Sequence, residues 1–217
     1  MQHLSVDIET YSSVDIKKCG LYKYVQAADF QVLLFAYSAD GAPVEVVDLV
    51  AGEQIPLEIL DALGNPGVLK HAYNAAFEWY CLSKHFHVAD LSGWLPQWRC
   101  TQLHGLYCGY TMGLGNVGAA LGLPQDRRKL STGLALIRLF CCPIKPTKNN
   151  GGRTRTLPQH EPEKWELFKT YCQQDVVTEM EVEHRLSAVP VPESEQVLWQ
   201  LDQITNARGV AIDATLV

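Results

Sequence analysis

The chain has 217 residues, of which 47% are hydrophobic, and its formal net charge is −6. This length suits one sizeable α/β domain, and so many apolar residues exclude an intrinsically disordered chain. No run of about 18 apolar residues occurs, and the first residues lack the blocks of a signal peptide, so we expect a cytoplasmic protein without a membrane segment. The seven cysteines lack metal-finger spacing, which predicts reduced, mostly buried thiols.

Basic residues are concentrated in one segment of this acidic chain. Between Arg127 and Arg155 there are eight basic residues and no Asp or Glu, whereas the rest of the chain carries 10 basic and 24 acidic residues. A solvated loop with helix-surface charges would give the same composition. An acidic body with one basic strip is also typical of a metal-dependent nuclease, whose strip holds phosphates. The absence of acidic residues over the whole segment favours phosphate contact.

The first predicted element is a strand over residues 3–9. Apolar residues occupy every second position, which is the period of a strand, and face one side: Leu4, Val6 and Ile8. Ser5, Asp7 and Glu9 face the other side. Because Asp7 and Glu9 are two residues apart on one face, they can share a metal ion.

The following elements alternate in the order of an α/β domain. Residues 31–38 and 43–49 predict two strands joined as a hairpin. Asn74 offers a side-chain acceptor that would cap the helix expected over 75–86. The other predicted elements are a helix near 55–63, a strand over 68–72, helices over 101–108 and 131–141, a glycine-rich turn at 113–118, an irregular and mobile loop between Pro143 and Pro158, and a long helix from about 162 to 186.

Two of these helices carry further acidic residues. Asn74 and Glu78 are four positions apart, as are Tyr171 and Asp175, so each pair would lie on one helix face. If Asp175 binds a metal ion, Tyr171 can orient the attacking water beside it. Tyrosine is a weak base at neutral pH, with a reference pKa of about 10, so the metal would have to acidify that water.

The strand and the two helices together supply four carboxylates: Asp7, Glu9, Glu78 and Asp175. This is the ligand set for two hard divalent cations, Mg²⁺ or Mn²⁺. Two such ions about 3.5–4 Å apart can hold both the attacking and the leaving oxygen of a phosphodiester. Each motif is weak by itself, but their order along the chain makes a nucleic-acid hydrolase the first hypothesis.

Three motifs carry a resemblance to a known family. V-D-I-E-T, H-A-Y-N-A-A-F-E and Y-C-Q-Q-D resemble the Exo motifs of the DEDD 3′–5′ exonucleases, and in particular the proofreading domain of bacteriophage-type family A DNA polymerases. The resemblance covers nearly the whole chain, and the tail at 206–213 resembles the entry into a family A polymerase domain. It implies an RNase H-like α/β fold with a mixed central sheet, an exonuclease domain over 1–190, and a linker with the start of a polymerase domain over 191–217.

The third motif assigns the chain to the tyrosine branch, because the position that holds histidine in the other branch is Thr170. The resemblance implies that Asp7 bridges both metal ions, that Glu9 and Asp175 complete the first metal site, and that Tyr171 positions the nucleophilic water.

The second motif departs from the family pattern. Glu78 stands where the family usually has Asp, and its side chain is one methylene longer. It can still reach the second ion through a water, because Mg²⁺ keeps several of its own waters. The longer arm can equally weaken that metal site. Asp90 is a poorer candidate because it lies beyond the helix that Glu78 begins.

These observations predict a metal-dependent 3′–5′ exonuclease that hydrolyses single-stranded DNA to nucleoside 5′-monophosphates. Its partners would be a DNA 3′ end and a polymerase domain C-terminal to this chain, in the cytoplasm of a phage-infected or bacterial host. The residues expected to contact DNA are Thr10, Tyr11, Asn74, Lys145, Lys148, Arg153 and Arg155. Two alternatives remain: an RNA-processing exonuclease of the same superfamily, and a DNA-holding polymerase module in which Glu78 marks a degraded site.

Overall fold

The computed structural model describes residues 1–111, 113–213 and 215. Within these residues, five strands form one mixed sheet in the order β3-β2-β1-β4-β5, in which β1 is antiparallel to β2 and parallel to β4. The strands are β1 (His3–Tyr11), β2 (Gln31–Ala39), β3 (Glu45–Asp48), β4 (Leu69–Ala72) and β5 (Trp98–Cys100). The central strand β1 is therefore the one that carries the first acidic motif.

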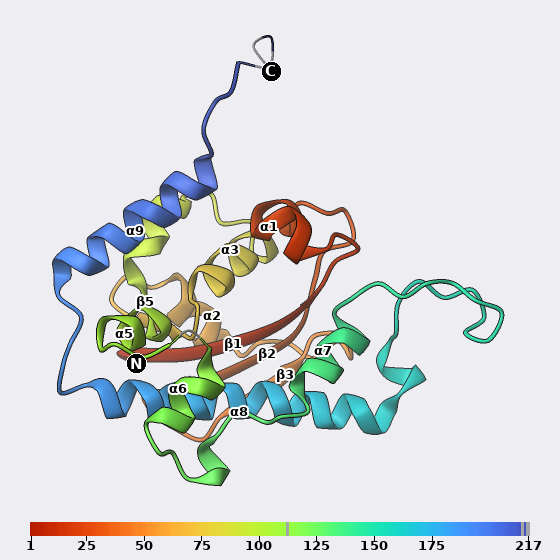
Figure 1. Cartoon of the computed structure of the whole chain (residues 1–217), viewed down its shortest axis with the longest axis horizontal. Helices are drawn as coiled ribbons and strands as arrows, with labels where there is room; N and C mark the ends of the chain where they lie inside the picture. The colour runs from red at the N-terminus through yellow and green to blue at the C-terminus, as the bar shows by residue number, and fades with distance from the viewer. Residues whose placement is uncertain (112, 214, 216–217) are drawn as a thin grey trace.

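Helices cover both faces of this sheet (Figure 1). The long helix α8 runs along one face and packs on β1, β2 and β3, while α3 and α9 lie on the opposite side. The helices are α1 (Ile16–Val25), α2 (Leu57–Gly64), α3 (Ala76–His85), α4 (Leu91–Trp94), α5 (Thr101–Tyr107), α6 (Leu114–Ala120), α7 (Gly133–Phe140), α8 (Pro162–Leu186) and α9 (Glu193–Arg208).

The alternation along β1 divides its residues between the two faces as predicted. Leu4, Val6 and Ile8 are buried in the larger core, beneath α2 and α3. The opposite face of the sheet packs against α7 and α8 in a second core, which contains Phe140 and Phe168. The fold is thus the α/β arrangement, with a mixed sheet between helices, that the sequence predicts.

The segment 113–118 differs from its prediction, because it begins α6 and is not a turn. Leu114 and Val117 of this helix are buried against Val182 and Leu186 of α8. Gly118 allows close packing, since a Cβ there would lie 3.3 Å from Leu123 Cδ1. Tertiary packing therefore overrides the turn preference of a glycine-rich sequence.

Residues 191–217 include a helix that the sequence pattern did not indicate. Trp199, Ile204 and Ala207 of α9 pack against the larger core, while Leu198 and Leu201 are exposed. Apolar residues therefore lie on more than one side of α9, which hides the usual amphipathic period. The expected polymerase domain beyond this helix stays a prediction, and residues 214, 216 and 217 lie outside the described part of the chain.

The state of the cysteines and the polarity of the helices agree with the expectations from composition. All seven cysteines lie within the described ranges and are free, and four of them are buried. Over those same ranges, no helix combines the length and the apolar character needed to cross a membrane.

Candidate active site

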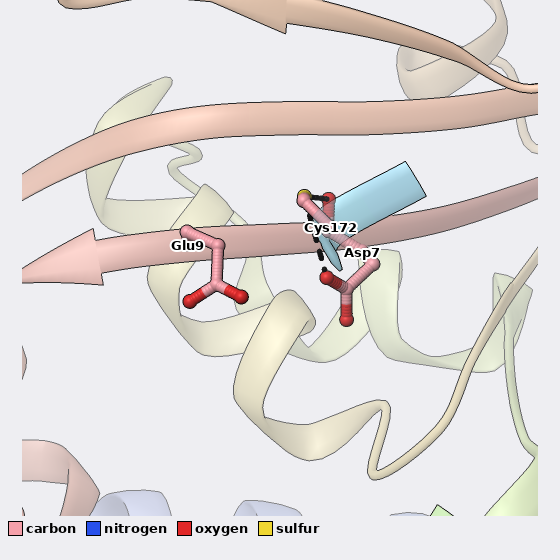
Figure 2. A group of neighbouring side chains, drawn as sticks. All are labelled: Asp7, Glu9 and Cys172. Atoms are coloured by element: carbon pink, nitrogen blue, oxygen red, sulfur yellow. Dashed lines mark hydrogen bonds between the residues drawn. The ribbon is translucent and has the colours of Figure 1, made fainter. Parts of the chain in front are cut away.

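Two acidic side chains project from β1 toward α8. Figure 2 shows Asp7 and Glu9 on the same side of the strand, with Cys172 of α8 next to Asp7. The Cys172 thiol donates a hydrogen bond to Asp7 Oδ2 (3.4 Å), and the Cys141 thiol donates one to Glu9 Oε2 (3.6 Å). One potential ligand atom each from Asp7, Glu9 and Cys172 lies within 4.8 Å of the others. The strand thus presents two carboxylates close enough to share an ion.

Glu78 comes from the first turn of α3 and is only 3% exposed. Its Oε2 is buried and has no hydrogen-bond partner among the described residues. Burial raises the pKa of Glu78 well above its usual range, and the charges of Asp7 and Glu9 add to this shift, so the three carboxylates share one electrostatic environment. The structure therefore brings the second motif to the acidic face of β1.

Asn74 does not cap α3, contrary to the prediction. Its φ is +68°, its side chain is exposed, and no side chain caps this helix. Asparagine is one of the few residues that tolerate this left-handed conformation, which the chain needs where it turns from β4 into α3. Asn74 and Glu78 therefore do not share a helix face, and the role of Asn74 at DNA stays a prediction.

Tyr171 and Asp175 lie one turn apart on α8 and are both buried. The ring of Phe168 stacks on Tyr171 with a centroid separation of 6.1 Å and an interplanar angle of 7°. Gly133, at the start of α7, packs directly against this ring, since a Cβ there would overlap Cε2 and Cζ of Tyr171. A glycine is therefore required at this position for Tyr171 to keep its place.

Lys129 is a site residue that the sequence motifs missed. Its ammonium group forms an ion pair with Asp175 Oδ2 and lies 4.6 Å from the centroid of the Tyr171 ring. In the sequence Lys129 is only one member of the basic segment, 46 residues before Asp175, and no spacing connects the two. Only its place in an acid-free basic segment points to a nearby anion.

Burial and mutual repulsion dominate the electrostatics of the carboxylates. Burial raises the pKa of Asp7 to about 8, the charge of Asp175 adds to this, and Lys129 opposes it. Burial also raises the pKa of Glu9 well above its usual range, and Asp7 adds to that shift. Like charges in a buried space favour protons or bound cations. One lysine cannot neutralise four carboxylates, so a bound cation would stabilise the ionised form of the cluster.

The donor set fits hard divalent cations. Glu78 Oε2 and Asp175 Oδ1 are buried without a partner among the described residues, and a buried carboxylate oxygen is stable only when it is paired. Burial, together with the neighbouring carboxylates, raises the pKa of the Cys172 thiol, so its sulfur stays protonated and serves as a donor to Asp7. Oxygen ligands without a thiolate match Mg²⁺ or Mn²⁺.

Thr10 and Tyr11, expected near the DNA terminus, are both buried at the end of β1. The Thr10 hydroxyl is hydrogen bonded to the Tyr24 hydroxyl at 2.8 Å. The Arg155 guanidinium lies over the Tyr11 ring, 3.9 Å from its centroid, and also donates to the Gln31 side chain. These contacts anchor the end of β1, and a role at the DNA terminus stays a prediction for Thr10, Tyr11 and Arg155.

Residues 143–157, called the basic arm below, project from the body of the protein (Figure 1). The predicted irregular loop is organised around Asn150, whose Oδ1 accepts from the backbone N–H groups of Thr147 and Gly152. Lys145 and Lys148 are exposed on this arm, whereas Arg153 is half-buried and donates to the Asn150 carbonyl. The arm thus presents two exposed ammonium groups to a ligand.

Comparison with known proteins supplies one close relative. The chain is 50% identical over all its 217 residues to a protein of Bacillus phage SP02 described as a DNA polymerase, and it spans only 33% of that protein. No family model matches the chain.

Solved structures resemble the fold at low sequence identity. A structure described as the apo form of the nuclease matches with a TM-score of 0.52, at 14% identity, over 94% of this chain and 80% of that one. Brucella melitensis NrnC matches with a TM-score of 0.51, at 14% identity, over 94% of this chain and 83% of that one. The sheet order and these likenesses identify an α/β fold of the RNase H-like exonuclease type. The chain is thus homologous, over its whole length, to one third of a phage DNA polymerase, in agreement with the resemblance to a phage polymerase seen in its motifs.

Proposed function

We propose that this chain is a metal-dependent 3′–5′ exonuclease that removes nucleotides from single-stranded DNA, as the proofreading part of a longer polymerase. The observation that carries this proposal is the convergence of four carboxylates from three separate elements, with Tyr171 beside Asp175. Homology to part of a phage DNA polymerase supports DNA as the substrate. A polymerase domain in the same protein and a cytoplasmic location belong to this proposal.

Asp7, Glu9, Glu78 and Asp175 would hold two divalent cations. When bound, such ions lower the pKa of a coordinated water and stabilise the charge that develops on the leaving 3′ oxygen. The charge of Asp7 raises the pKa of both Glu9 and Glu78, and the charge of Asp175 raises the pKa of Asp7. Asp7 is therefore the carboxylate that would contact both ions, while Glu9 and Asp175 would complete one of the sites.

Tyr171 would orient the attacking water. Burial and the charge of Asp175 raise the pKa of the Tyr171 phenol above its ordinary value, so its hydroxyl keeps its proton. A protonated phenol can donate or accept a hydrogen bond but cannot act as a base at neutral pH. Tyr171 therefore positions the nucleophile, and Phe168 and Gly133 fix the orientation of its ring.

Single-stranded DNA is the expected substrate because Glu9, Glu78 and Asp175 are buried, so that only an unpaired 3′ terminus could reach them. Lys145 and Lys148 of the basic arm would contact phosphates upstream of this terminus. Lysine side chains on a loop can make these phosphate contacts because the attraction depends on charge and tolerates some variation in distance.

The decisive experiment incubates the chain with a 5′-labelled single-stranded DNA oligonucleotide in Mg²⁺, in Mn²⁺ and in EDTA. We expect a ladder that shortens from the 3′ end with either metal and stays intact in EDTA. Full-length oligonucleotide under all three conditions, with DNA binding retained, would contradict the proposal and favour the DNA-holding module.

RNA is the second candidate substrate, because the motifs resemble a superfamily that also includes RNA-processing exonucleases. RNA and DNA oligonucleotides of one sequence, compared by kcat/KM, separate the two candidates. We expect faster degradation of DNA, and a preference for RNA would move the assignment to RNA processing.

A further inference from the structure

Glu179 is a buried acidic residue with no place in the mechanism above. It lies one turn after Asp175 on α8 and is 2% exposed. The hydroxyl of Thr101, at the start of α5, donates a hydrogen bond to Glu179 Oε1. Its other oxygen, Oε2, is buried and has no partner among the described residues. Half of this carboxylate is therefore free to bind a further donor.

No basic side chain accompanies Glu179 in the described part of the chain, where none of the ion pairs includes it. An ionised carboxylate in such a place is strongly unfavourable unless a cation or several hydrogen bonds compensate it. Burial raises the pKa of Glu179 to about 7, against the lowering effect of the Thr101 and Ser5 hydroxyls. Glu179 would therefore be stabilised by positive charge from outside the described residues, such as a bound cation.

Glu179 also lies next to the carboxylate site. Ser5, which is close enough to lower its pKa, is on the same face of β1 as Asp7. The charge of Glu179 raises the pKa of both Asp7 and Glu78. Tyr171, Asp175 and Glu179 follow one another at four-residue spacing, so they form one row along α8. Glu179 is the member of this row whose charge raises the pKa of Glu78.

We propose that Glu179 is a fifth carboxylate of the site, which accepts hydrogen bonds from water molecules on the divalent ion held beside Asp7 and Glu78. This inference rests on the proposed function. An indirect contact is favoured because Thr101 already binds Oε1, so Glu179 has only the Oε2 oxygen to offer. Mg²⁺ and Mn²⁺ bind several waters whose protons need acceptors, and the free Oε2 supplies one.

This role accounts for two orphaned oxygens at once. Glu78 Oε2 and Glu179 Oε2 are both buried without partners among the described residues, and they belong to helices on either side of Asp7. Waters around one ion can satisfy both oxygens. The longer side chain of Glu78 then needs no direct bond to the ion, because Glu179 helps to hold the same hydration shell.

The test is a calorimetric titration of the metal-stripped chain with Mn²⁺. Glu179→Gln keeps an acceptor for Thr101 but removes the charge, and we expect one of the two binding steps to weaken about 10–100-fold. Glu183→Gln, one turn further along α8 and partly exposed, is the matched control and should titrate like the wild type. Glu179→Asp keeps the charge on a shorter side chain and should weaken the same step less, so a folding failure of the Gln variant leaves the test intact.

Three outcomes would overturn the inference. Wild-type binding of both ions by Glu179→Gln and Glu179→Asp would show that Glu179 only ties α5 to α8 through Thr101. Equal weakening by Glu183→Gln would show a general effect of negative charge on α8. A wild-type chain that takes up no Mn²⁺ would refute the proposed function together with the inference, which separates that failure from the first two.

Discussion

The carboxylate site and the basic arm differ in how the protein positions their charges. The carboxylates stand on β1, α3 and α8, inside or beside the two cores, and packing fixes their side chains. The arm lies outside the body, and hydrogen bonds to one asparagine, Asn150, shape it. The site therefore combines burial with fixed geometry, whereas the arm combines exposure with charge.

This difference matches two kinds of contact with a nucleic acid. Bond cleavage needs groups placed within a fraction of an ångström, and regular elements provide that accuracy. Backbone binding needs positive charge at roughly the right place, which a loop provides. Substitutions in the site should therefore change the rate of the chemical step, and substitutions in the arm should change affinity and its salt dependence.

Asp7→Ala should have the largest effect. Removing the carboxylate that would bridge both ions should lower kcat by about 10³-fold or more, since a metal ion contributes several kcal/mol to the stabilisation of the transition state. Initial rates on a single-stranded oligonucleotide measure this, with circular dichroism as the check on folding. Activity within a few fold of the wild type in a folded Asp7→Ala variant would remove Asp7 from the site.

Gly133→Ala tests whether the packing of Tyr171 matters for the rate. The added methyl group would overlap Tyr171 Cε2, so the ring or α7 must move. We expect about a 10–100-fold lower kcat, because small displacements of a positioning group are costly, and destabilisation of about 1–3 kcal/mol from overpacking. Gly105→Ala is the control, since a methyl group there meets Val117 at an ordinary 3.8 Å. Equal activities of the two variants would show that Tyr171 is not held by Gly133.

The double substitution Lys145→Ala and Lys148→Ala tests the arm. We expect KM to rise several fold with kcat unchanged, because both ammonium groups are exposed and lie on a loop outside the buried site. On a single strand, each phosphate that the variant no longer neutralises should make the salt dependence of binding shallower by about 0.7. Fluorescence anisotropy with a labelled oligonucleotide at several salt concentrations measures both affinity and slope. An unchanged slope would mean that the arm does not bind phosphates.

The smallest expected effect is on the pH dependence of stability, which should change with a substitution in the carboxylate site but not with one in the basic arm. Burial raises the pKa of Asp7 from 3.8 to about 8, so in EDTA the folded protein binds more protons than the unfolded chain over this range. The free energy of unfolding should then decrease as the pH rises from about 4 to 8. Asp7→Asn should be more thermostable than the wild type at pH 8, and this difference in thermostability should be smaller at pH 5. The arm double variant should follow the wild type, and identical pH profiles for all three would contradict the raised pKa.

Local patterns in the sequence were sufficient for much of the framework. Pro162 at the first turn marks the start of α8, which ends at Leu186 as predicted, and alternation alone assigned the two faces of β1. Asn74 was misjudged because asparagine suits both a cap and a left-handed turn, and only the path from β4 to α3 decides between them.

The site residues that sequence reasoning missed act through contacts between distant parts of the chain. Lys129 reaches Asp175, Thr101 reaches Glu179, and Gly133 packs on Tyr171, and none of these pairs has a spacing that a pattern can detect. Motifs report the residues of one element at a time. Partners supplied by a second element emerge only when the fold brings the elements together.

The contact between Gly133 and Tyr171 also constrains how this protein can change over evolutionary time. The tyrosine ring fills the volume that any side chain at position 133 would need. A chain that keeps the tyrosine must therefore keep a glycine 38 residues earlier, whereas a smaller residue can replace the tyrosine while the glycine stays. Among homologues a larger residue at position 133 should consequently occur only where the tyrosine at 171 has been lost, even where the acidic motifs have diverged.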